Sequence, residues 1–280
     1  MAIGVLVTKN LSSSKSYFEV KELFMVTYKK KYGIFKVTES WFGSKSGIQN
    51  LFGLKAYLHV KNAAPVPLAV KDVTYTIEIP LDREVDEILG SFPKNLRVDI
   101  RKAEEAGITT YFHNDIQGFA AFYNDFACKK QVHPISERRL SELGDTLMMS
   151  YAVRNGKILS AHSYILDRNE SIVRAFRSAT IRLEEDVNGI MVGRANKLLH
   201  FKDMVHFRGM GIQVYDFGGY AMNTHDAQLQ GINNFKEKFG GEIVPCENYY
   251  SIPYMILRCI GRRLGILGEI ASERNTLSGT

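Results

Sequence analysis

The sequence predicts an α/β (α+β) fold in which helices flank a mixed sheet. Residues 146–180 contain three strand-like runs joined by short turns, as in an antiparallel meander. Helix-like and strand-like patterns then alternate from residue 188 to residue 250. A strand-rich segment within the first 90 residues precedes this larger unit.

The composition is that of a globular protein with ample material for a core, since 45% of the 280 residues are hydrophobic and 24% are charged. The net charge of +6 favours anionic partners, which include phosphorylated small molecules, RNA and membrane surfaces. The three cysteines are odd in number and far apart, and none has metal-ligand spacing: Cys128, Cys246 and Cys259. They indicate a reducing compartment.

Neither a signal peptide nor a membrane-spanning segment is expected. The N-terminal run AIGVLV is short and lacks a basic segment before it. No apolar run approaches the roughly 20 residues that span a bilayer. We therefore expect a cytoplasmic protein, with peripheral contact to the inner face of the membrane as an alternative.

Strands are expected in the N-terminal half, residues 1–90, because β-branched and aromatic residues gather there in runs separated by turn formers. These runs are residues 32–40, 54–62 and 73–81. Residues 63–70 contain two prolines and are expected to form a connection or a sheet edge.

Two helices are expected between residues 93 and 131. Pro93 is placed to open the first helix and Gly107 to cap its end. Basic residues of this helix share a face: Lys94, Arg97 and Arg101. The second helix spans residues 116–131, where phenylalanines recur on one side.

The meander is expected at residues 146–155, 157–167 and 171–180. Asn155-Gly156, between the first two strands, is a strong hairpin signal. A helix at 188–209, a strand at 212–219 and a helix at 227–241 are expected to follow, and residues 242–260 to add one or two strands.

Two motifs resemble those of a known family. NLRVDIRKAEEAGI is similar to the basic helix of the Fem-type (FemAB-like) aminoacyl transferases. YDFGG followed by GINNFKEKFGGE resembles that family's C-terminal signature, in which a strand with D-F-G-G precedes a helix. The order of meander, helix, strand, helix and strand also resembles the GNAT acyltransferase fold.

The resemblance covers roughly residues 75–250. It implies a FemAB-like GNAT domain at residues 91–260, after a reduced N-terminal GNAT-like half and before a C-terminal tail at residues 261–280. Fem-type enzymes that build peptidoglycan cross-bridges are usually longer, with two GNAT-like halves and a helical arm. Shorter chains of this kind resemble acyltransferases of envelope polysaccharide pathways more closely.

The activity implied by the resemblance is transfer of an acyl or aminoacyl group to an amine on a cell-envelope precursor, either a sugar or a peptide. Transfer is direct, with no tightly bound cofactor and no metal, and the donor is aminoacyl-tRNA or acyl-CoA. One alternative is an acyl-CoA-dependent N-acyltransferase that acts on a nucleotide-activated amino sugar. Another is a non-catalytic basic module that binds RNA or a membrane. DNA is not an expected partner.

The candidate site lies around the second motif. Glycines at Gly218 and Gly219 allow a ligand to approach the main chain closely, although a Gly-Gly pair is also typical of a plain turn. In the family, the lysine of the F-K pair is associated with stabilising negative charge, and Lys236 occupies that place. An ordinary snorkelling lysine is the alternative. The expected substrate-binding residues are Phe217, Gly218, Gly219, Tyr220 and Phe235.

Two further residues are candidates for acid–base roles. Asp216 is a candidate for orienting an amine, and it could equally cap a turn. His162 lies in the middle of an expected strand, where it is a candidate base if it faces the cleft and a structural residue if it does not.

Two segments of the sequence bear on the identity of the donor. Glu184, Glu185 and Asp186 stand where a CoA pyrophosphate would lie, which disfavours CoA, although acidic residues also suit a helix N-terminus. The basic face of Lys94, Arg97 and Arg101 is expected to meet donor phosphate, with a solvated helix face as the alternative. Apolar and arginine residues near the C-terminus suit membrane contact, but glycines among them favour packing on the domain.

Overall fold

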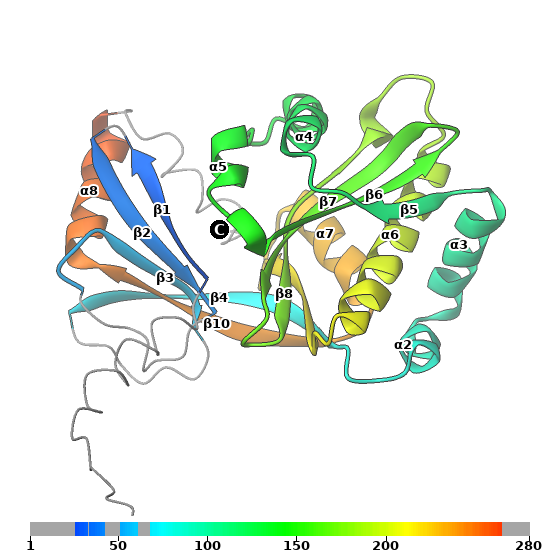
Figure 1. Ribbon diagram of the computed structural model, residues 1–280, viewed down its shortest axis with the longest axis horizontal. Helices are drawn as coiled ribbons and strands as arrows, with labels where there is room; N and C mark the ends of the chain where they lie inside the picture. Colours follow the sequence, from blue (N-terminus) through cyan, green and yellow to red (C-terminus); the bar gives the residue numbers. More distant parts are fainter. Residues whose placement is uncertain (1–25, 33, 43–50, 61–67, 265–280) are drawn as a thin grey trace, which may run out of the picture.

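The computed structural model describes residues 26–32, 34–42, 51–60 and 68–264. They form one mixed sheet with helices on both faces (Figure 1), so the predicted fold class is confirmed. The sheet contains ten strands in the order β1-β2-β3-β10-β4-β9-β8-β7-β6-β5. In chain order these are β1 (Val26–Tyr32), β2 (Phe35–Trp41), β3 (Lys55–Val60), β4 (Ala69–Pro80), β5 (Thr109–Phe112), β6 (Leu147–Arg154), β7 (Lys157–Asp167), β8 (Ile172–Thr180), β9 (Val214–Tyr220) and β10 (Glu242–Ser251).

The α-helices of the described residues are α2 (Val85–Ser91), α3 (Lys94–Glu105), α4 (Ile116–Lys130), α5 (Glu137–Ser141), α6 (Gly189–Gly209), α7 (Ala227–Glu237) and α8 (Ile252–Leu264). No helix among the described residues is long and apolar enough to cross a membrane. One face of the sheet is covered by helices α2, α3, α6 and α7. Helix α4 packs on the other face, in a core that also contains side chains of β1, β2 and β3.

The local signals in the sequence explain the elements that it predicted. Asn155 and Gly156 both have positive φ, 51° and 75°, as the tight turn between β6 and β7 requires. Pro93 is the N-cap of α3, and Gly107 follows its end at φ 75°. The Asn188 side chain accepts hydrogen bonds from two backbone amides at the start of α6. The predicted meander and the predicted helices α3 and α6 are therefore confirmed.

Several boundaries were wrong. The strand expected to end at Gly219 continues to Tyr220, so the glycine pair lies inside β9. Residues 242–260 form one strand and then helix α8, where strands alone were expected. No element was predicted for β1, α2, α5 or β5. The last three, at 7, 5 and 4 residues, are too short to show a periodic pattern.

The last strand joins distant parts of the chain. β10 pairs antiparallel with β3 on one side and with β4 on the other. β4 in turn pairs with β9, so β4 and β10 run from the first half of the sheet into the second (Figure 1). A division at residue 90 stays a prediction, and residues 265–280 of the expected tail lie outside the described residues.

The sheet opens between β8 and β9. These neighbours are parallel, and among the described residues they pair only from Ile172 to Arg174 and from Val214 to Asp216. Beyond that point Ala175–Thr180 has no partner in β9, because the two strands diverge. Phe217 and the glycine pair of β9 therefore lie beside the opening.

Candidate active site

The glycine pair shapes a bulge at the edge of the opening. Thr76 of β4 pairs with Gly219, whereas Glu78 pairs with Asp216, so β9 has one extra residue there. Gly218 has φ 77°, and a Cβ at this position would lie 3.0 Å from the carbonyl oxygen of Ala175. Both the left-handed backbone and the close approach to β8 require glycine.

Lys236 reaches this bulge from the last turn of α7. Its Nζ donates to the carbonyl oxygens of Gly218 at 3.1 Å and Gly219 at 2.5 Å. Burial and the nearby positive charge of Arg174 lower the pKa of Lys236 from 10.5 to about 7, against an opposing effect of Asp216. A lysine with this pKa changes its charge near neutral pH.

Asp216 is the centre of a buried polar cluster. Arg174 Nη1 donates to its Oδ2 at 2.5 Å, and the backbone amide of Gly218 donates to its Oδ1 at 2.7 Å. The Thr76 hydroxyl bonds the same carboxylate. Burial raises the pKa of Asp216, but Arg174, His59 and these hydrogen bonds outweigh it and lower the pKa below its ordinary value.

This geometry gives Asp216 a different role from the expected one. Both carboxylate oxygens have protein partners and the residue is 1% exposed, so an acceptor amine has no access to it. Asp216 instead holds the bulge and compensates the charge of Arg174. The sequence analysis missed Arg174 and Thr76, which lie 42 and 140 residues away from Asp216 along the chain.

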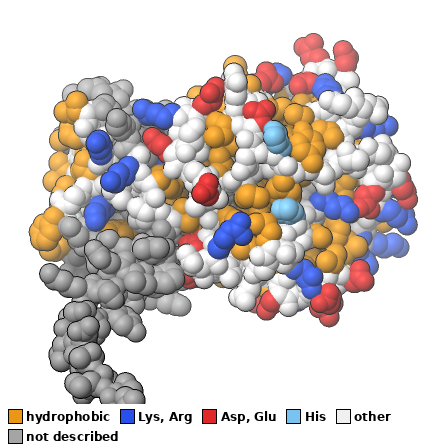
Figure 2. Space-filling model, viewed as in Figure 1, with side chains coloured by type: hydrophobic (Ala, Val, Ile, Leu, Met, Phe, Trp, Pro, Cys, Tyr) orange, Lys and Arg blue, Asp and Glu red, His pale blue; other side chains and the backbone are white. Residues whose placement is uncertain are grey.

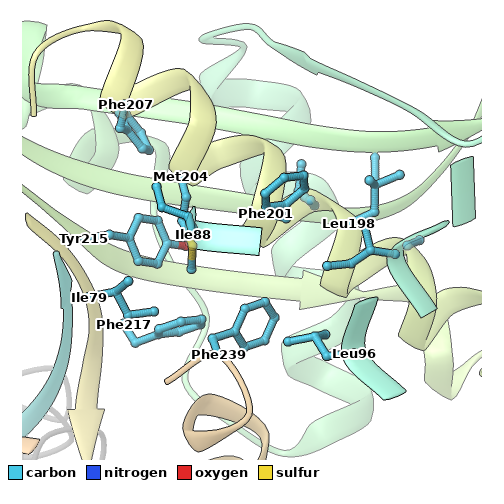
Figure 3. Close-up of a cluster of buried hydrophobic side chains, with 14 of the residues drawn as sticks. Ile79, Ile88, Leu96, Leu198, Phe201, Met204, Phe207, Tyr215, Phe217 and Phe239 are labelled. Carbon is cyan, nitrogen blue, oxygen red and sulfur yellow. The ribbon is translucent and has the colours of Figure 1, made fainter. Parts of the chain in front are cut away.

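The expected substrate-binding side chains fall into two groups. Phe217 is 4% exposed and packs on Phe239, with ring centroids 5.0 Å apart, so its ring belongs to the core (Figure 3). Phe235 is half-buried and also packs on Phe239. Tyr220 is half-buried and nearer the surface, where its hydroxyl donates to Glu237 Oε1 at 2.7 Å and the pKa of Tyr220 is raised by that bond. The geometry therefore leaves Tyr220 and the half-buried Gly219 as the accessible candidates.

His162 belongs to a buried network under α6. Its Nδ1 lies 2.9 Å from Asp203 Oδ2, and its Nε2 lies 2.8 Å from Asn196 Oδ1. The ring is 1% exposed. The expectation of a base that faces the cleft is therefore wrong, because both ring nitrogens are engaged inside the protein.

The network continues from Asp203 towards the site. Tyr164 donates to Asp203 at 2.5 Å, the Tyr164 and Tyr215 hydroxyls lie 2.8 Å apart, and Tyr215 lies 2.8 Å from His200 Nδ1. Burial raises the pKa of both tyrosines and lowers that of His200. The signal for this network was present: His200 and Asp203 lie on the face of α6 that also carries Val192 and Leu199, where polar residues are unusual.

The same three residues, His162, His200 and Asp203, have ligand atoms within 4.8 Å of one another and are of the types that bind zinc. However, the Tyr164 hydroxyl already bonds Asp203 and lies 3.0 Å from His162 Nδ1. A metal ion would have to displace this hydroxyl, so the arrangement favours a hydrogen-bonded network. The prediction of no metal stays a prediction.

The basic residues of α3 lie away from the bulge. Lys94, Arg97 and Arg101 are exposed, and Arg101 lies 3.5 Å from Glu105 one turn later. On the edge of the molecule where α3 lies, Lys and Arg side chains are interspersed with Asp and Glu (Figure 2). This surface carries mixed charge, so phosphate binding by α3 stays a prediction.

The acidic segment before α6 is partly neutralised. Glu184 forms an ion pair with Lys157 at 2.8 Å, whereas Glu185 and Asp186 are exposed. The Asn188 side chain occupies the amides of Ile190 and Met191, which a phosphate at this helix N-terminus would otherwise use.

Comparison with known proteins places this geometry in a fold. No family model and no curated protein matches the sequence. Among solved structures, FemX is similar with a TM-score of 0.58 and 12% identity, covering 84% of this chain and 85% of that one. L-PGS from Bacillus licheniformis is similar with a TM-score of 0.53 and 12% identity, covering 85% of each chain.

A third similar structure is the C-terminal domain of a lysylphosphatidylglycerol synthetase from Agrobacterium fabrum. Its TM-score is 0.51 at 10% identity, with 84% of this chain and 85% of that one covered. At such identities the likeness concerns the fold alone. The chain therefore has a Fem/GNAT-like fold.

Proposed function

We propose that the chain is an acyl or aminoacyl transferase that delivers its group directly to an amine on a cell-envelope precursor. The observation that carries the proposal is the position of Lys236, whose Nζ lies on the bulge of β9 beside the opening of the sheet. The likeness to FemX and to the lysylphosphatidylglycerol synthetase domain supports a transferase of this fold.

The reaction requires stabilisation of a developing negative charge. The acceptor nitrogen attacks the carbonyl carbon of the donor ester, a C–N bond forms, and the carbonyl oxygen becomes an oxyanion. An ammonium group has three N–H donors, and Lys236 uses two of them on Gly218 and Gly219. The third can donate to the oxyanion. Collapse then breaks the C–O bond to the donor, and the proton lost by the amine passes to the leaving oxygen.

Aminoacyl-tRNA is the donor that we propose. Capping by Asn188 and the exposed acids Glu185 and Asp186 disfavour a CoA pyrophosphate at the start of α6. The pairing of Glu184 with Lys157 weakens this repulsion, and acyl-CoA is therefore the second candidate, with a nucleotide-activated amino sugar as acceptor.

A donor comparison tests the proposal. Purified chain is offered charged tRNA or acetyl-CoA with envelope-precursor acceptors, and the modified amine is detected by mass spectrometry. We expect transfer from charged tRNA and no thermal stabilisation by millimolar acetyl-CoA, whereas a micromolar ligand would contribute roughly 4 kcal/mol. Stabilisation with release of free thiol would replace this donor by CoA. No transfer from either donor would favour the non-catalytic module.

The basic helix gives the same experiment a second arm. Reversal of Arg97 and Arg101 to glutamate removes two positive charges from an exposed face. If these residues contact tRNA phosphate, affinity and its salt dependence should both fall, because fewer counterions are released. An unchanged affinity and salt slope would show that the face is only solvated.

A further inference from the structure

The outer face of α8 is apolar although it is exposed. Ile252, Ile256 and Ile260 are 44%, 55% and 50% exposed and follow one another at four-residue spacing. We call them the apolar stripe. The opposite face of α8 is buried against the sheet, where the Tyr254 ring stacks on Tyr250 at 5.7 Å. The helix therefore has one apolar face in the core and another towards solvent.

A second exposed apolar element is the tip of the β1–β2 hairpin. Ile34 is 91% exposed and Phe35 is 42% exposed. In Figure 1 this tip lies at the same corner of the view as the C-terminal end of α8. Hydrophobic side chains line the corresponding edge in Figure 2, and Lys and Arg side chains lie just inside it.

Exposed cations border the hairpin tip. Helix α8 contains no acidic residue, and its Arg258 is buried with its guanidinium over the Tyr250 ring. Lys29 and Lys36 are exposed on the two strands of the hairpin. Apolar side chains bordered by cations fit the boundary between headgroups and acyl chains of an anionic bilayer.

We propose that the apolar stripe and the hairpin tip form a docking surface for an anionic lipid bilayer. A second copy of the chain fits less well, because a two-fold contact would place the same positive residues opposite one another. The stripe would enter the interface while the cations meet lipid phosphates. This inference does not rest on the transferase proposal, since binding is measured without donor or acceptor.

Vesicle sedimentation of the full chain tests the inference. The vesicles are phosphatidylcholine alone or phosphatidylcholine with about one third phosphatidylglycerol. We expect preferential binding to the anionic vesicles. The Ile256→Asp/Ile260→Asp variant should bind at least about tenfold more weakly, because apolar burial in the interface is lost.

A matched control places the same change elsewhere. Leu183 and Ile190 are 46% and 68% exposed before and within the first turn of α6, and Leu183→Asp/Ile190→Asp should bind like the unaltered chain. Lys29→Glu/Lys36→Glu should lose about fivefold per lysine and show a weaker salt dependence. Thermal melts check that each variant is folded.

Three results would overturn the inference. The first is no binding of the unaltered chain to anionic vesicles. The second is equal loss in the α8 variant and in the Leu183→Asp/Ile190→Asp control. The third is a dimer, seen by light scattering, that the α8 variant dissociates while vesicle binding is absent, which would make a second copy the occupant.

Discussion

Two Gly-Gly pairs, one in β9 before α7 and one just after α7, have different roles. Before the helix, Gly218 has φ 77° inside a strand, and a Cβ there would lie 3.0 Å from one carbonyl oxygen. After the helix, Gly241 has φ 90°, and a Cβ would lie 2.5 Å from the carbonyl oxygen of Glu78 and 2.8 Å from Ile79. The first pair accepts hydrogen bonds from Lys236, whereas the second lies against β4.

The structural role of a glycine pair therefore depends on the residues that surround it. Gly241 is required by packing, because the chain passes directly over the backbone of β4. Gly218 is required by a bulge that turns carbonyl groups towards a lysine. We therefore expect substitutions at the second pair to affect stability most, and those at the first pair to affect turnover as well.

The largest expected effect is at Gly241. Gly241→Ala should lower the free energy of unfolding by about 4 kcal/mol, since it combines a left-handed backbone with a clash against β4. Gly240→Ala is the matched control, because Gly240 has φ 76° but a Cβ at this position would meet nothing within 4 Å. It should lose only about 1 kcal/mol. Equal losses in urea denaturation would contradict the packing explanation.

Lys236 tests the first glycine pair, whose carbonyl oxygens accept its hydrogen bonds. Lys236→Met should reduce turnover by about 100-fold, which corresponds to about 2.7 kcal/mol of transition-state stabilisation, with the fold intact. Lys238→Met is the control, because Lys238 is an exposed neighbour in the same helix terminus. Turnover is measured with the donor that supports transfer. A folded Lys236→Met variant with full turnover would remove the lysine from the mechanism.

Gly218 should show a mixture of both effects. Gly218→Ala is expected to cost about 2 kcal/mol of stability, less than Gly241→Ala because the contact with Ala175 is longer. It should also slow turnover by moving the carbonyl groups that Lys236 bonds. Gly156→Ala, at φ 75° in the hairpin with open space around it, is the control for backbone strain alone. A loss of stability without any loss of turnover would show that the geometry of the bulge does not contribute to catalysis.

The smallest expected effect, taken per pH unit, is a pH dependence of stability. The folded-state pKa of Lys236 is about 7, below its ordinary 10.5, so the unfolded chain binds more protons between these values. Stability from this group should therefore rise with pH above about 7, by at most about 1.4 kcal/mol per pH unit relative to Lys236→Met. Melts of both proteins between pH 6 and pH 9 measure the difference. Parallel curves of stability against pH for the two proteins would mean that folding does not lower the pKa of Lys236.

Local signals predicted most of the second half of the fold. Asn155-Gly156, Pro93 and Gly107 act on their immediate neighbours, and the structure uses each as expected. The start of helix α8 was not predicted, although Ile256 and Ile260 have helical spacing, because Ser251 and Ile252 join strand and helix without a turn residue between them. Pairing of β10 with β3 and β4 has no local signal, since both partner strands begin more than 170 residues earlier.

The candidate site was predictable only in part. Lys236 and the glycine pair share one motif, so a short stretch of sequence placed them together. Arg174 was not identified, because it lies on β8 and meets Asp216 only where β8 pairs with β9, after the long connection through α6. His162 was placed on the correct strand, and the structural alternative holds, since the residues that bond it, Asp203 and Asn196, come from α6.

The insertion of β10 between β3 and β4 has a consequence for synthesis on the ribosome. The first strands emerge early, yet the strand that separates and joins β3 and β4 is complete only at Ser251. Until then the edges of β3 and β4 that pair with β10 are exposed, and they can pair incorrectly. Such mispairing is a hazard for chains with many non-local contacts. We expect this half of the sheet to form late, after the meander, whose strands are close neighbours in the sequence.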